Sequence, residues 1–172
     1  SDALNTAYLT ALRNSQIDLL GGVEVAKSAL LDAAEELDAW NEIGNGPIKI
    51  RHTFWGDGSK DDNKNAALRG ARAIIEKYGY IPFDNQFASA GDSGYVLYAS
   101  GFMDSADDVI AAYDRLREMM ELVNSEAGSD NVLYADLYKA YSTLTPAVES
   151  YYEAVSNLNS NLSEQHILQA LQ

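Results

Sequence analysis

Apolar residues recur at alternating steps of four and three along residues 131–162, which is the spacing of one face of a long helix. This face comprises Leu133, Leu137, Ala140, Leu144, Val148, Tyr151, Val155, Leu158 and Leu162. Pro146 lies inside the pattern without shifting its phase, although a proline inside a helix removes one hydrogen bond and crowds the preceding turn. The pattern predicts either one long kinked helix or two coaxial helices that divide at Pro146.

A second pattern of the same period covers residues 2–43, and Gly44-Asn45-Gly46-Pro47 ends it. Gly21 and Gly22 interrupt its composition but not its phase, so either the helix breaks there or another backbone or a ligand approaches closely. We expect two long helices that cover each other's apolar faces. The apolar positions of this second helix are Leu12, Leu19, Val23, Ala26, Leu30, Ala33, Leu37 and Trp40.

Two shorter helices are expected between the long ones. One begins at Ser105, whose side chain can accept from the amide of Asp108 in a capping box. Its inward positions are Val109, Tyr113, Leu116, Met120 and Val123. The other runs from about Asn65 to Tyr78, with Leu68, Ala71, Ile75 and Tyr78 inward. A short terminal helix capped by Ser163 is expected at the end of the chain.

The helical period is absent from residues 44–64 and 80–104. Ile48 and Ile50 alternate there with Lys49 and Arg51, which indicates a short strand or extended segment that residues 95–98 could pair with. We therefore predict one mostly α-helical domain over residues 1–172. It is an up-down bundle of about four helices, two of them long, with irregular insertions at about 44–64 and 80–104. Both chain ends lie at one end of such a bundle, as in a sensor domain held between membrane helices.

Composition narrows the classes of partner. The 172 residues include 12 Lys plus Arg against 26 Asp plus Glu, a formal charge of −14. This charge repels phosphate backbones and anionic headgroups, so neither nucleic acid nor a membrane surface is an expected partner. No apolar run reaches the roughly 18 residues of a membrane span, so we expect no membrane insertion by this segment. The absence of cysteine excludes disulfides, thiolate metal sites and cysteine nucleophiles.

The composition also indicates a location. Tyr, Asn, Ser and Asp are plentiful and Lys is scarce, which favours an extracytoplasmic location: periplasmic, cell-surface or secreted. The chain begins with Ser1-Asp2 rather than Met, so we expect a processed or trimmed chain.

Motifs for catalysis and metal binding are incomplete. Gly91-Asp92-Ser93-Gly94 matches, as a string, the surroundings of the nucleophile in chymotrypsin-like proteases. That chemistry needs a base in reach, and the only histidines are His52 and His166, so we predict a turn at Gly91–Gly94 instead. We expect a structural role for His52, with a functional role as the alternative. We expect no catalytic residues and no cofactor.

Two clusters of acidic residues have the composition, but not the spacing, of metal sites. Residues 57–63 fail as an EF-hand because Asp62 replaces the required glycine and Leu68 the required glutamate. A solvated loop is therefore predicted, with an irregular calcium site as the alternative. Glu35, Glu36 and Asp38 lack the Glu-x-x-His pairs of a bundle metal site, which predicts a solvated face. We assign no metal ligands.

Basic and aromatic residues gather near the insertions and form the candidate site. On a protein this acidic, a local positive patch suits an anionic small ligand, and salt bridges to nearby carboxylates are the alternative. The candidate ligand contacts, where residues 47–55 and 80–102 cap the bundle, are Arg51, Trp55, Arg69, Arg72 and Tyr95. Tyrosines form a second group, which either seals the core edge or serves an interface: Tyr134, Tyr138, Tyr141, Tyr151 and Tyr152.

The leading functional hypothesis is a non-enzymatic extracytoplasmic recognition domain that binds a small molecule, of the sensor or solute-binding type. The alternative is a structural or adhesive surface protein that interacts with another protein chain through its helical faces. A homo-oligomer is compatible with both. An enzyme ranks third because no acid, base and nucleophile converge.

Overall fold

The computed structural model describes residues 2–40, 49–55, 62–78, 81–82, 92–98 and 105–172. The chain is mostly α-helical, as predicted. Within these ranges lie four helices: α1 (Asp2–Trp40), α2 (Asp62–Tyr78), α3 (Ala106–Ala127) and α4 (Val132–Ala170). The strands β1 (Lys49–Trp55), β2 (Ile81–Pro82) and β3 (Asp92–Tyr98) form an antiparallel sheet in the order β1-β3-β2.

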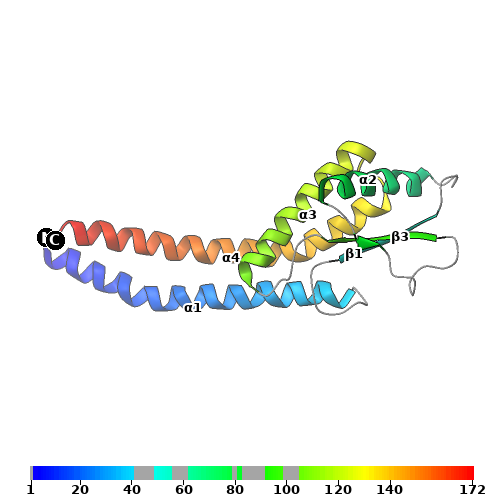
Figure 1. Ribbon diagram of the computed structural model, residues 1–172. Coiled ribbons are helices and arrows are strands. Elements are labelled where there is room, and N and C mark those ends of the chain that lie inside the picture. The colour runs from blue at the N-terminus through cyan, green and yellow to red at the C-terminus, as the bar shows by residue number, and fades with distance from the viewer. Residues whose placement is uncertain (1, 41–48, 56–61, 79–80, 83–91, 99–104) are drawn as a thin grey trace.

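Helices α1 and α4, of 39 residues each, lie side by side along most of their length (Figure 1). The N- and C-termini lie together at one end of this pair, and α2, α3 and the sheet lie toward the other end (Figure 1). We call residues 2–25 and 150–172 the stalk, and α2, α3 and the sheet the head. The prediction that two long helices cover each other's apolar faces is confirmed, since Leu30, Leu37, Leu137 and Leu144 are all buried.

Helix α3 packs against both α2 and α4, and its inward face is the predicted one. Ser105 caps the helix by accepting a hydrogen bond of 3.2 Å from the amide of Asp108. Asn131 caps α4 in the same way, accepting from the amide of Tyr134 at 3.0 Å. The predicted positions are all buried: Val109, Tyr113, Leu116, Met120 and Val123.

Helix α2 approaches α3 closely at Gly70. A Cβ atom at this position would lie 2.9 Å from Cγ1 of Val123, so only glycine fits without a shift of the neighbouring side chain. Ala67, Ala71 and Ile74 are fully buried on the same helix. The helix starts at Asp62, three residues before the predicted start. Of the predicted inward positions, Ala71 is confirmed, and the side chains of Leu68, Ile75 and Tyr78 lie outside the described part.

The long helices have no internal breaks. α1 continues through Gly21 and Gly22, and a Cβ atom at either glycine would meet nothing within 4 Å, so no described segment of the chain approaches there. α4 continues through Pro146, which decides for one helix over two. It also continues through Ser163, so the prediction of a separate terminal helix is wrong, because the helical hydrogen bonds simply run on to Ala170.

Two buried polar residues, Asn161 and Gln165, interrupt the predicted apolar face of α4 in the stalk, and we call them the polar layer. The predicted inward residue Leu162 is 40% exposed, whereas its neighbour Asn161 is 7% exposed. Asn161 donates from Nδ2 to the carbonyl oxygen of Leu12 at 3.0 Å, and its Oδ1 accepts from Nε2 of Gln165 at 2.6 Å. Nε2 of Gln165 also lies 2.9 Å from Oε1 of Gln16 on α1. These hydrogen bonds between helices favour Asn161 over Leu162 at the seam and fix the register of α1 against α4.

The strands occupy parts of both insertions. In the register of β1 and β3, His52 lies opposite Tyr95 and Trp55 opposite Asp92. The turn predicted at Gly91–Gly94 is wrong for residues 92–94, which belong to β3 because they pair with residues 53–55; Gly91 lies outside the described residues.

Replacing Gly70 tests the α2–α3 contact. Gly70→Ala places a methyl group against the stiff side chain of Val123, so we expect the free energy of unfolding to fall by about 1–3 kcal/mol in urea denaturation. Gly21→Ala is the matched control, because this exposed helical glycine has space around it and should gain about 0.5–1 kcal/mol. Equal effects of the two substitutions would contradict close packing at Gly70.

Replacing Asn161 tests the polar layer. Asn161→Ala removes the bond to Leu12 and one partner of the buried Gln165 amide, so we expect a loss of about 1–3 kcal/mol in unfolding free energy. Asn159→Ala, an exposed asparagine two residues away, should change it by less than about 0.5 kcal/mol. Thermal and urea unfolding measure the unfolding free energy of both variants. If Asn161→Ala lowers it no more than Asn159→Ala does, the polar layer does not stabilise the fold.

Candidate functional site

The predicted site residues belong to three elements of the head. Arg51 and Trp55 belong to β1, and Tyr95 belongs to the adjacent strand β3. Arg69 and Arg72 lie on α2, which contacts β1. The structure therefore brings the two strands side by side and places α2 next to them, while the side chains of Arg51, Trp55 and Tyr95 lie outside the described part.

The two arginines of α2 are exposed, and their spacing places them on one face of the helix. Guanidinium groups bind carboxylates and phosphates through paired N–H donors. Two of them, one turn apart, form a surface suited to a small anion with more than one oxygen. This pair is the described portion of the candidate site.

The acidic clusters give no metal centre among the residues that can be described. Glu35 and Glu36 are exposed, which confirms the predicted solvated face for these two. No group of three or more His, Asp or Glu side chains converges within the described ranges. Of the predicted oxygen-rich loop, residues 57–61 lie outside the structure's description, and Asp62 and Asn63 form the first turn of α2.

The tyrosines divide into two classes. Tyr134, Tyr141 and Tyr151 pack at the edge of the core, as one of the two interpretations predicts, whereas Tyr138 and Tyr152 are 55% and 51% exposed. The outer pair thus has area for contact with another molecule.

A polar chain links α3 and α4 through Tyr141. Its ring stacks on that of Tyr113, with centroids 4.3 Å apart and planes 9° from parallel. Thr145 Oγ1 donates to the carbonyl oxygen of Tyr141 at 2.9 Å, so Tyr113 Oη donates to Thr145 Oγ1 at 3.1 Å. The hydrogen bond with Tyr113, followed by burial, raises the pKa of Tyr141 to about 12. The phenol of Tyr141 is therefore neutral near pH 7, and the tyrosine pair joins α3 to α4.

A cleft of about 360 Å³ lies where the start of α3 meets α1 and α4. Glu24 and Lys27 on its α1 wall form an ion pair of 3.4 Å, and Asp107 lies on its α3 wall. Two carboxylates and one ammonium group offset the positive end of α3, so this cleft does not favour an anion. Sequence reasoning missed the cleft because helix packing creates it. Its lining is Glu24, Lys27, Ser28, Leu31, Ser105, Ala106, Asp107 and Tyr151.

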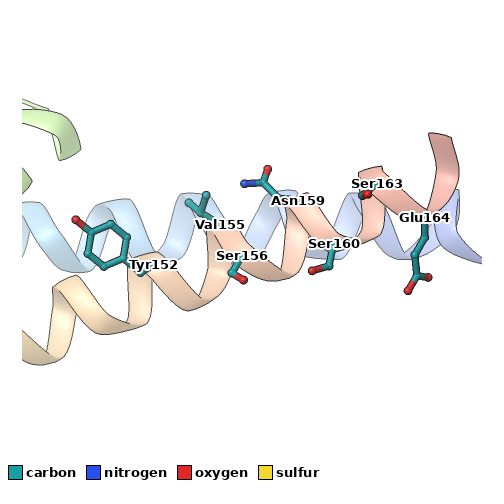
Figure 2. A pocket seen from close by; sticks show the side chains of 7 residues that line it. All are labelled: Tyr152, Val155, Ser156, Asn159, Ser160, Ser163 and Glu164. Carbon is teal, nitrogen blue, oxygen red and sulfur yellow. The ribbon is translucent and has the colours of Figure 1, made fainter. Parts of the chain in front are cut away.

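A second hollow, of about 590 Å³, lies on the outer surface of α4 in the stalk (Figure 2). Every lining residue belongs to α4, so the hollow has no opposing wall and is open to solvent. Val155 and Asn159 point to one side of the helix, and Ser156 and Ser160 point to the other (Figure 2). A small molecule would not be enclosed here, whereas another helix could lie against the surface. The lining is Tyr152, Val155, Ser156, Asn159, Ser160, Ser163 and Glu164.

Comparison with protein-family models, with curated proteins and with solved structures finds no match to this chain. Among the helices that the structure describes, none combines the length and apolar character needed to cross a membrane.

The tyrosine pair gives a pH dependence that can be tested. A folded-state pKa of about 12 for Tyr141, against 10.0 ordinarily, stabilises the fold below pH 10; this contribution is lost as the pH rises from 10 to about 12. Tyr113→Phe should return the pKa of Tyr141 toward 10. The loss of stability between pH 10 and about 12 should then disappear. Titration of ¹³C-labelled tyrosine by NMR measures the pKa. Tyr138→Phe is the exposed control, and a Tyr141 pKa that stays near 12 in Tyr113→Phe would exclude Tyr113 as the cause.

Proposed function

We propose that this protein is a non-enzymatic extracytoplasmic recognition domain that binds a small anionic molecule at its head. The proposed contacts are Arg51, Trp55, Arg69, Arg72 and Tyr95. The observation that carries the proposal is the exposed pair Arg69 and Arg72 on α2, beside the strand that contains Arg51 and Trp55. A positive patch on a protein of net charge −14 attracts an anion that the rest of the surface repels.

The proposed framework is an up-down bundle whose stalk carries the head at the end opposite the chain termini. In a sensor or solute-binding module, this arrangement keeps the ligand site far from the end of the stalk at which the chain termini lie. The extracytoplasmic location rests on composition: tyrosine, asparagine and serine are plentiful and lysine is scarce. A catalytic role is not proposed, since the sequence supplies no convergent acid, base and nucleophile.

The second candidate function is a structural or adhesive surface protein that binds another chain through its helical faces. A specific observation favours it: large apolar side chains are exposed along the stalk. They include Leu4, Tyr8, Ile17, Leu20, Val25, Tyr152, Leu162, Ile167 and Leu171. The two functions use different parts of the molecule and give different signals.

A thermal-shift screen tests the recognition function. The panel contains amino acids, organic acids, sugars, nucleotides and calcium. A ligand at 100 times its dissociation constant stabilises by about 2.7 kcal/mol, which raises the melting temperature by about 5 to 10 °C for a domain of this size. We expect a hit among the anionic compounds.

Substitutions then locate the site. Trp55→Ala and Arg69→Ala should each abolish the shift, because they remove an apolar contact and a guanidinium group at the head. Arg13→Ala, an exposed arginine in the stalk, makes the same change of charge far from the head and should leave affinity unchanged. Unchanged affinity in both head variants would exclude the proposed site. If no compound in the panel shifts the melting temperature, the second candidate function is favoured.

A further inference from the structure

An apolar column on α4 continues beyond the part of the helix that α3 covers. Its members, Tyr134, Tyr141, Val148, Val155 and Leu162, are spaced by seven residues, or about two turns, and so lie on one face. The first three pack in the core cluster that includes α3. Val155 is only half-buried and Leu162 is 40% exposed. The face of α4 that packs against α3 therefore continues into the stalk, where none of the described elements covers it.

Helix α1 shows the same change on the same side of the hairpin. Ala34 is buried in the core cluster, and Lys27, seven residues earlier, lines the cleft at the start of α3. Leu20, seven residues earlier again, is 45% exposed, and Ile17, one turn away on that side, is 72% exposed. Tyr152 adjoins Val155 in the same way on α4. We call Ile17, Leu20, Tyr152, Val155 and Leu162 the stalk strip.

The stalk places polar residues inside and apolar residues outside. Asn161 and Gln165 are each 7% exposed in the seam, whereas Leu162 between them is 40% exposed. The two amides are hydrogen-bonded within one chain, so the unfavourable feature of an isolated hairpin is the apolar surface that Leu162 and its neighbours leave in water. Burying the stalk strip as well removes that surface from water, and the amides keep their hydrogen bonds in the interior of a larger bundle.

The charges around the stalk strip indicate what covers it. From residue 154 to 163, α4 carries no charged residue, and from residue 3 to 17, α1 carries only Arg13. The five strip residues are uncharged, and the nearest carboxylates in sequence are Asp18 and Glu153, so a partner that binds through ion pairs finds few charges here. Two copies of a chain with net charge −14 repel each other least where charges are sparse, so the strip is where a second copy approaches most easily.

The size of the surface also fits a second copy. The stalk from Leu4 to Val25 is about 33 Å long at 1.5 Å per residue, and two helices side by side are about 20 Å wide. This gives a face of about 650 Å², close to the roughly 800 Å² per partner of a standard stable interface. We propose that two copies of this chain pack stalk strip against stalk strip, so that the two hairpins form one four-helix bundle.

Sedimentation equilibrium over about 1 to 300 µM tests the proposal. We expect a dimer whose dissociation constant rises at least about tenfold in Ile17→Glu and in Leu162→Glu, since each change buries a carboxylate at the interface. Both side chains are exposed in one copy, so circular dichroism should show intact helices in both variants.

Val25→Glu is the matched control. Val25 is β-branched and 72% exposed like Ile17, but it lies about 140° around the helix from Leu20, and about 80° around and about 12 Å along the helix from Ile17. Its dissociation constant should stay within about twofold of the unmodified chain. A chain that is monomeric throughout the range would overturn the proposal and leave the strip to a different partner. A dimer unaffected by both strip variants would place the interface elsewhere.

Salt provides a second readout. Each copy carries −14, so raising NaCl from about 50 mM to about 500 mM should tighten the dimer by screening repulsion between the copies. Weakening of the dimer by salt would indicate an interface held by ion pairs and would overturn the assignment to the stalk strip. Neither outcome depends on the head, so this proposal and the small-molecule site fail separately.

Discussion

The pairing of α1 with α4 is the contact on which the rest of the structure depends. Each helix presents one apolar stripe, and in the stalk the other helix is its only described cover. The amides of Asn161 and Gln165 fix how the helices slide against each other, because a shift by one residue would separate Asn161 from the Leu12 carbonyl. The same pairing then gives α3 a two-helix surface on which to pack, and α3 in turn holds α2 at Gly70.

The buried face of a helix was predictable wherever apolar residues occupy one side of it and polar residues the other. Val109, Leu116 and Val123 leave α3 a single apolar side, and the structure buries that side. The seam of α4 was not predictable at Leu162, since Asn161 and Leu162 differ by one position and tertiary hydrogen bonds decide between them. Gly70 carried no signal in the sequence either, because its role depends on a side chain 53 positions away on another helix.

The candidate site was predictable only in part. Helical spacing indicates that Arg69 and Arg72 share a face, and both are exposed. The cleft beside Ser105 and the hollow on α4 could not be read from the chain, because the first requires three helices to meet and the second requires the register that exposes Tyr152 and Val155. Local pattern thus gives helices and faces, whereas concave surfaces arise from how distant segments come together.

The polar layer also has a consequence for the order in which the protein folds. The hydrogen bond between Asn161 and Leu12 spans 149 residues of sequence, and the bond between Gln165 and Gln16 spans the same separation. Contacts of such separation carry a high entropic cost of loop closure, whereas α3 and α4 are joined by a short turn. During synthesis α1 emerges before α4, so the apolar stripe of α1 stays uncovered until α4 has been made. We therefore expect α1 to be the last long helix to dock, and its uncovered apolar stripe to be the part of the nascent chain most exposed to aggregation.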